Sequence, residues 1–133
     1  MIKFGEKLAT QLSSGFCLEL IGDVGAGKTA LTKALVQALG STDEVTSPSF
    51  TINNRYQLPK GKVVSHYDFY RLGEAGVVGQ ELIEDLMAPT TSVIIEWAAT
   101  VNQILPPNRV QIKIQTLADG KRELEINGLE GKI

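Results

Sequence analysis

The stretch Gly22-Asp-Val-Gly-Ala-Gly-Lys28-Thr29 matches the pattern G-x-x-x-x-G-K-[ST] at every defined position. In such a loop the glycines let the backbone wrap around a phosphate group, and successive N–H groups point inward. Because Gly makes up only about 7% of residues in proteins, fewer than about 1% of chains this long contain the pattern by chance. The stretch therefore predicts a nucleotide-binding phosphate loop.

The sequence on either side of this loop has the pattern that a phosphate loop requires. Residues 16–21 are mostly apolar and predict a strand, and residues 28–39 carry Leu31, Leu35 and Leu39 at helical spacing. Gly40 supplies a stop for this helix. Residues 3–13, before the strand, predict a short amphipathic helix. A strand, a phosphate loop and a helix in this order indicate the start of a partly parallel sheet.

The chain after Gly40 is predicted to consist mostly of strands. Hairpins are indicated at both ends of this part, and a short helix and a β-branched strand lie between them. The predicted elements are strands 49–58 and 62–69 around Pro59-Lys-Gly61, a helix over 79–87, a strand over 92–97, and strands 110–115 and 123–127. We therefore predict one α/β domain, a P-loop NTPase-like mixed sheet with flanking helices and antiparallel edge hairpins.

The composition argues against several classes of protein. Of the 133 residues, 43% are hydrophobic and 21% are charged, and the net charge is −2. No run of Lys and Arg builds the extended basic face typical of direct nucleic-acid binders, so we expect no stable contact with nucleic acid. No apolar stretch approaches the ~20 residues that span a bilayer, and the first residues lack a signal-peptide pattern. We expect a cytoplasmic protein, with its single cysteine, Cys17, as a buried structural thiol.

The phosphate loop also predicts which residues bind nucleotide and metal. The Lys28 ammonium is expected to reach the β- and γ-phosphates of ATP, and the Thr29 hydroxyl is expected to ligate Mg²⁺. The helix that starts near Lys28 adds its positive N-terminal end. The predicted nucleotide-binding residues are Asp23, Val24, Gly25, Ala26, Gly27, Lys28, Thr29 and Ala30.

A P-loop enzyme also needs an acidic residue at the end of a buried strand, to hold Mg²⁺ or to polarise water. Glu96 follows the apolar run Val93-Ile-Ile95, and Asp68 ends a looser version of the same pattern. Spacing alone leaves both open as the magnesium-linked acid, with Glu96 favoured. His66 alternates with Asp68, so both side chains can lie on one face of the sheet. Arg71 can pair with phosphate or form an exposed salt bridge.

Four motifs resemble those of the TsaE (YjeE) family in their order along the chain. They are the phosphate loop, Thr46-Ser-Pro-Ser-Phe50, His66-Tyr-Asp-Phe-Tyr-Arg71 and Ile94-Ile-Glu-Trp97, and the resemblance spans roughly residues 4–125. Members of this family are bacterial ATPases required for making threonylcarbamoyladenosine next to the anticodon of certain tRNAs. The resemblance implies one P-loop ATPase domain over residues 1–133, with ATP and Mg²⁺ as cofactors.

The resemblance further implies roles for individual residues and a set of partners. Thr29 and Glu96 look like the magnesium-linked pair, and Asp68 looks like the acid needed for hydrolysis, so Lys28, Asp68 and Glu96 are the expected catalytic residues. Thr46-Ser47 looks like part of a loop that responds to the γ-phosphate. The family acts on a complex of the TsaD and TsaB proteins, which transfers the threonylcarbamoyl group, and these two proteins are the expected partners.

Three other functions are alternatives to this interpretation. A GTPase is disfavoured because the chain has no N-K-x-D motif to read guanine. A small-molecule kinase would use several arginines in a lid, whereas the arginines here, at 55, 71, 109 and 122, are scattered along the sequence. A nucleotide-gated binding module, with incidental hydrolysis, differs from an ATPase only in whether turnover matters.

Overall fold

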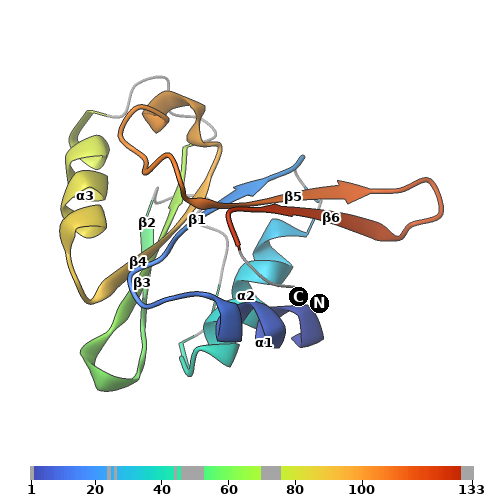
Figure 1. Ribbon diagram of the computed structural model, residues 1–133, viewed down its shortest axis with the longest axis horizontal. Helices are drawn as coiled ribbons and strands as arrows, with labels where there is room; N and C mark the ends of the chain where they lie inside the picture. Colours follow the sequence, from blue (N-terminus) through green and yellow to red (C-terminus); the bar gives the residue numbers. More distant parts are fainter. Residues whose placement is uncertain are drawn as a thin grey trace.

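The computed structural model describes residues 2–23, 25, 27–43, 45, 53–69 and 76–129, which form a six-stranded sheet and three α-helices (Figure 1). The helices are α1 (Ile2–Gln11), α2 (Lys28–Ala38) and α3 (Gly76–Met87). The strands are β1 (Cys17–Ile21), β2 (Asn53–Gln57), β3 (Val63–Asp68), β4 (Thr91–Glu96), β5 (Val110–Thr116) and β6 (Arg122–Asn127), with short 3-10 turns at Pro59–Gly61 and Ala98–Val101.

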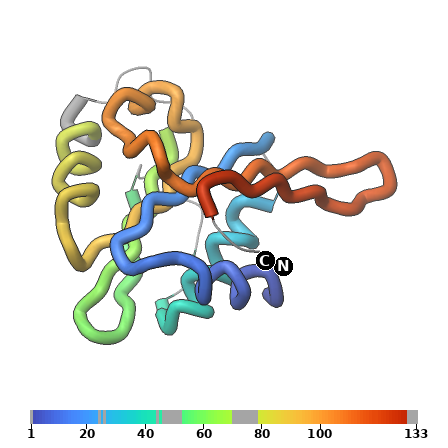
Figure 2. Tube along the Cα trace, viewed as in Figure 1, coloured from blue at the N-terminus to red at the C-terminus, as the bar shows by residue number. Residues whose placement is uncertain are grey.

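The strand order is β2-β3-β4-β1-β5-β6. Strand β1 runs parallel to both of its neighbours, β4 and β5, and β3 runs parallel to β4. The edge strands β2 and β6 are antiparallel to their neighbours and belong to the two predicted hairpins. The predicted fold class, a mixed α/β sheet with antiparallel edge hairpins, is therefore confirmed. The β5–β6 hairpin extends beyond the rest of the molecule (Figure 2).

Apolar side chains alternate along the central strands, so the sheet has a hydrophobic core on each face. On one face, Leu18 and Leu20 of β1 belong to a hydrophobic cluster that also contains Leu31 and Leu35 of α2 and Leu8 of α1. On the other face, Leu82 of α3 belongs to a second cluster with residues of β3 and β4. Helices α1 and α2 thus cover one face, and α3 covers part of the other.

Cys17 belongs to the second cluster and is buried. Burial raises the pKa of its thiol to about 11, so the sulfur stays protonated and unreactive at neutral pH. The structure places Cys17 in the structural role that the sequence predicts.

Most predicted elements differ from the structure by one to three residues at their ends; the first predicted helix, for example, spans 2–11 rather than 3–13. The strand predicted over 92–97 ends at Glu96, because Trp97 adopts a left-handed backbone conformation (φ 57°, ψ 53°) that a strand cannot continue through. The predicted helix over 79–87 begins earlier, at Gly76. Residues 49–52 of the first predicted hairpin lie outside the described residues.

Gly5 allows α1 and α2 to cross closely, which leads to a prediction about stability. A Cβ atom on Gly5 would lie 2.6 Å from the Ala34 Cβ and 2.8 Å from the Ala34 carbonyl carbon. We expect Gly5→Val to lower the free energy of unfolding by about 1–3 kcal/mol, because the helices must separate to admit the side chain. Urea denaturation followed by circular dichroism measures this. Glu6→Val, at the exposed neighbouring position, is the control, and equal losses in both variants would contradict the close crossing.

Among the described residues, no helix combines the length and apolar character needed to cross a membrane.

Candidate functional site

The phosphate loop leaves the C-terminal end of β1 and leads into α2. Gly25 and Gly27 have φ angles of 84° and 108°, a region that residues with a Cβ rarely adopt. Gly27 is also the N-cap of α2, so no side chain of its own occupies the start of that helix. The loop glycines and the positive end of α2 therefore present a surface suited to an anion. The predicted loop residues Val24 and Ala26 lie outside the described residues.

Lys28 lies at the centre of the site and is 6% exposed. Its ammonium donates a hydrogen bond to the Gly22 carbonyl oxygen and lies 3.8 Å from Glu96 Oε1. It also lies 4.4 Å from the centre of the Trp97 ring, a cation–π contact. The left-handed conformation of Trp97 turns the chain directly after Glu96, where this contact forms. The cation is thus held at the phosphate loop by one carbonyl, one carboxylate and one aromatic face.

The two candidate acids lie side by side at the ends of neighbouring parallel strands. Asp68 and Glu96 are paired in the β3–β4 register, and the Phe69 N–H donates to the Glu96 carbonyl oxygen at 3.1 Å. Glu96 is only 4% exposed, so it is not a solvent-facing carboxylate at a strand end. Asp68 is half-buried. Both acids therefore lie at the C-terminal ends of the parallel strands, the same end of the sheet at which the phosphate loop follows β1.

The other predicted loop residues are accessible. Asp23, Thr29 and Ala30 have side chains that solvent reaches, the last two in the first turn of α2. The Thr29 hydroxyl is therefore available to a ligand that binds at the loop. The predicted Thr46-Ser47 and Arg71 lie outside the described residues.

His66 and Arg122 also reach the site. The His66 Nε2 lies 2.5 Å from Glu96 Oε2, and the ring is fully buried. Arg122 at the start of β6 lies against Gly27, where a Cβ atom would be 3.1 Å from the guanidinium carbon. In the sequence, Arg122 is one of four scattered arginines. Only the alignment of β6 in the sheet, which local sequence does not specify, brings it beside the loop.

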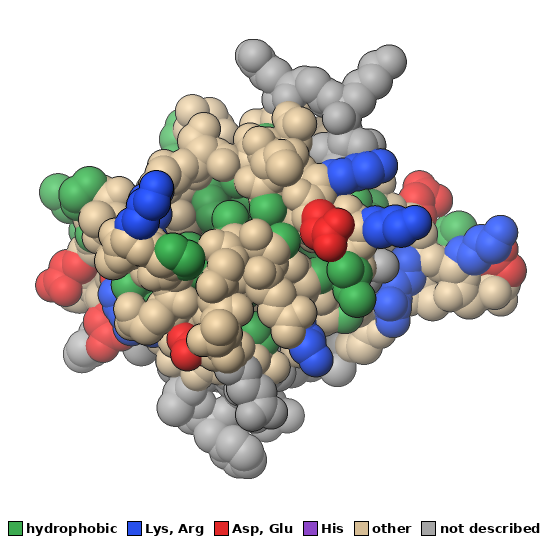
Figure 3. All heavy atoms as spheres, turned by 90° about the horizontal axis from the view of Figure 1, so that it is seen from below, with side chains coloured by type: hydrophobic (Ala, Val, Ile, Leu, Met, Phe, Trp, Pro, Cys, Tyr) green, Lys and Arg blue, Asp and Glu red, His purple; other side chains and the backbone are tan. Residues whose placement is uncertain are grey.

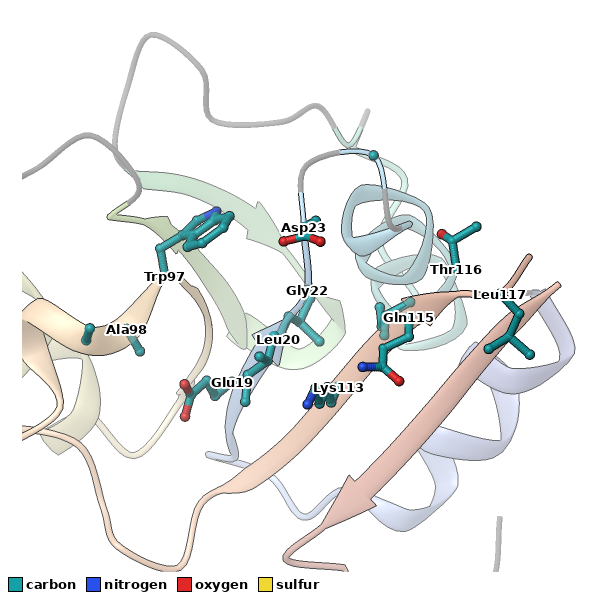
Figure 4. Close-up of a pocket in the computed structure, with 14 residues that line it drawn as sticks. Glu19, Leu20, Gly22, Asp23, Trp97, Ala98, Lys113, Gln115, Thr116 and Leu117 are labelled. Atoms are coloured by element: carbon teal, nitrogen blue, oxygen red, sulfur yellow. The ribbon is translucent and has the colours of Figure 1, made fainter. Parts of the chain in front are cut away.

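A pocket of about 920 Å³ adjoins the loop. Its wall includes Gly22 and Asp23 of the loop, Trp97 on one side, and Lys113 and Gln115 of β5 on the other (Figure 4). This volume is in the range of pockets that take small organic ligands. The pocket and the loop together form one continuous concave site.

The carboxylate of Glu19 also faces this pocket, but it is already paired. Glu19 Oε1 accepts hydrogen bonds from Arg109 Nε at 2.8 Å and from Gln111 Nε2 at 3.0 Å. The pairing ties β5 and the segment before it to β1. Glu19 is therefore a structural carboxylate rather than a third candidate acid.

The residues present fit a magnesium ion bound together with a phosphate. No group of three or more His, Cys, Asp or Glu side chains able to hold a metal occurs among the described residues. Mg²⁺ usually keeps several waters and is bound through one or two carboxylates and substrate phosphates, so it does not need such a group. One buried carboxylate, Glu96, and the exposed Thr29 beside an anion-binding loop match that requirement.

Comparisons with known proteins agree on one family. Residues 1–124 match the family model described as threonylcarbamoyl adenosine biosynthesis protein TsaE. The chain is 32% identical to the tRNA threonylcarbamoyladenosine biosynthesis protein TsaE of Haemophilus influenzae, over 91% of this chain and 79% of that protein. It is 32% identical to the protein of the same description from Streptomyces coelicolor, over 97% and 90% of the two chains. A crystal structure of Bacillus subtilis YdiB is similar, with a TM-score of 0.67 and 34% identity, over 92% of this chain and 75% of that one.

Proposed function

The chain belongs to the TsaE family of tRNA threonylcarbamoyladenosine biosynthesis proteins, and from this we propose that it is a cytoplasmic, magnesium-dependent ATPase serving that modification. The observation that carries the proposal is the placement of Lys28. A nearly buried ammonium lies within a glycine-rich loop at the start of a helix, 3.8 Å from a buried carboxylate. This combination of groups is suited to the phosphates of a nucleotide and a divalent cation.

Each residue of the site has a role in this proposal. The loop backbone and the α2 N-terminus hold the phosphates, and Lys28 exchanges its contact with the Gly22 carbonyl for a phosphate oxygen. Thr29 and Glu96 hold Mg²⁺, which offsets the charge of the phosphates. Arg122 adds a second cation beside Gly27. The adjoining pocket, with Trp97 and the β5 side chains, takes the nucleoside.

Asp68 is proposed to act on the attacking water. It lies in register with Glu96 on the neighbouring strand, and it is more exposed than Glu96, so water has access to it. A carboxylate in this position can accept the water's proton or orient the water toward the γ-phosphate. Glu96 is proposed to bind the metal, so the two acids have separate roles: Glu96 in metal binding and Asp68 in activating water.

We further propose that the protein acts through a complex of TsaD and TsaB proteins rather than by binding tRNA directly. On the face shown in Figure 3, the Lys and Arg side chains of the described residues are interspersed with acidic ones. A surface on which positive and negative side chains alternate gives little of the electrostatic attraction to phosphate on which direct nucleic-acid binding depends. The net charge of −2 points the same way.

The experiment that tests this proposal measures ATP hydrolysis with and without TsaD and TsaB proteins from the same source. We expect slow hydrolysis by the protein alone and faster hydrolysis with both partners, because partner contacts complete the site. An inactive Lys28→Ala protein serves as the background control. No stimulation would contradict the partner assignment, and transfer of the γ-phosphate to a metabolite would replace the ATPase with a kinase.

A further inference from the structure

We propose that His66 is a positioning residue, which fixes the Glu96 carboxylate so that Lys28 is free to leave it for phosphate. The inference rests on the proposed binding of magnesium and ATP, but the contact that carries it lies entirely within the protein. His66 Nε2 is 2.5 Å from Glu96 Oε2, whereas Lys28 Nζ approaches the other oxygen, Oε1, at 3.8 Å. One carboxylate oxygen therefore contacts a neighbouring strand, and the other contacts the phosphate loop.

The surroundings of the ring assign its tautomer. His66 is 0% exposed, and among the described residues its Nδ1 has no hydrogen-bond partner. A proton on Nδ1 would leave a buried donor without an acceptor and would set the Nε2 lone pair against the carboxylate. The tautomer with Nε2–H leaves only an acceptor unpaired and donates directly to Glu96. The hydrogen-bond partners thus assign the Nε2–H form.

The hydrogen bond from His66 stabilises the buried Glu96 carboxylate when Lys28 moves away from it. When Lys28 turns toward phosphate, Glu96 loses its cation while it remains 4% exposed. A buried carboxylate without a partner is costly, and it would pull Lys28 back. The hydrogen bond from His66 keeps Oε2 satisfied in both positions of Lys28. Oε1 then remains oriented toward the loop, where the proposed magnesium ion binds.

Strand geometry explains why a residue at this position can reach Glu96. His66 pairs with Ile94 in the parallel register of β3 and β4, two residues before the pair of Asp68 with Glu96. Residues two apart project from the same face of a strand. The ring therefore lies behind the two acids, on the side away from the end of the sheet, where it can orient a carboxylate without occupying the metal site. Partners of metal-linked carboxylates act in this way in other proteins, and their loss typically costs 10–100-fold in metal affinity.

Tyr67 offers a matched control on the same strand. Its side chain is also fully buried, but it lies on the opposite face of the sheet, where its hydroxyl donates to Asp85 Oδ2. Burial and this hydrogen bond raise the pKa of Tyr67, so the hydroxyl remains a donor. Tyr67→Phe therefore removes one buried hydrogen bond from β3 without touching Glu96.

The first test uses the fact that His66 is the only histidine in the chain. Long-range ¹H–¹⁵N NMR spectra of the ligand-free protein detect the two ring nitrogens without overlap. We expect a protonated Nε2 and an unprotonated Nδ1, and we expect Glu96→Gln to shift the Nε2 resonance while Tyr67→Phe does not. A protonated Nδ1, or a ring unaffected by Glu96→Gln, would overturn the proposal.

The second test measures the Mg²⁺ dependence of ATP binding by calorimetry. We expect His66→Leu to weaken the apparent affinity for Mg²⁺ about tenfold, His66→Gln to restore most of it through its amide donor, and Tyr67→Phe to leave it unchanged. An unchanged affinity in His66→Leu, or equal losses in His66→Leu and Tyr67→Phe, would overturn the positioning role. If His66→Leu does not fold, the ring-nitrogen spectra of the wild type and of Glu96→Gln still decide. A wild-type protein that binds no MgATP would instead refute the proposed function, and the spectra would still decide whether His66 holds Glu96.

Discussion

Replacing Lys28 with alanine is expected to abolish ATP turnover and to weaken ATP binding by about 2–5 kcal/mol, the usual cost of removing one partner of a buried charge pair. Lys28 supplies a cation from within the loop itself, and it is held there by Gly22, Glu96 and Trp97. Without it, the γ-phosphate would face the buried Glu96 carboxylate with no intervening charge from α2. Isothermal titration calorimetry measures the binding, and phosphate release measures the turnover.

The control for this variant is Lys33→Ala. Lys33 lies on the same helix but is exposed, so its loss removes the same charge from the protein without entering the site. Lys33→Ala should bind and hydrolyse ATP as the wild type does. Hydrolysis that survives in Lys28→Ala would refute the assignment of the phosphate loop, since no other side chain of residues 22–29 carries a positive charge.

Neutralising the two acids separately should produce two different defects. Glu96→Gln is expected to remove most of the Mg²⁺ dependence of ATP binding, because an amide is a poor ligand for this ion. Asp68→Asn is expected to leave binding nearly intact and to slow hydrolysis by a factor of about 10² to 10⁴, the usual contribution of a general base. Titrating each variant with ATP in the presence and absence of Mg²⁺, and then measuring single-turnover hydrolysis, separates the two effects.

Asp85→Asn is the matched control for both acids. Asp85 is buried like Glu96, but it lies in α3 and pairs with Arg55 and Tyr67 on the other side of the sheet. The Asp85→Asn protein should be less stable than the wild type, but its ATP binding should depend on Mg²⁺ as the wild type's does. If Glu96→Gln slows hydrolysis alone and Asp68→Asn loses the metal, the two roles have been exchanged.

Much of the fold could be predicted from the sequence, because its signals are local. Alternation and turn residues located both hairpins, and the phosphate-loop pattern located β1 and α2. The end of β4 could not be located in this way. Nothing in the string Ile94-Ile-Glu-Trp97 indicates that Trp97 takes a left-handed conformation, since an isolated tryptophan has no preference for it.

The candidate site was predictable only where a motif marks it. Lys28, Asp68 and Glu96 follow from their positions at the ends of predicted strands or within the loop. The contact of His66 with Glu96, and that of Arg122 with Gly27, depend on which strands become neighbours and in what register. Strand order is a property of the whole sheet, so a pattern within one segment does not reveal it.

The central position of β1 has a consequence for how the protein is made. In the described sheet, the strand that carries the phosphate loop lies between β4 and β5 and pairs with both, and these strands begin at Thr91 and Val110. A ribosome therefore synthesises α1, β1 and α2 before it synthesises either partner strand. Such distant pairings form late in folding. We therefore expect a nascent chain to bind ATP only once β5 has left the exit tunnel, so nucleotide binding indicates a completed sheet.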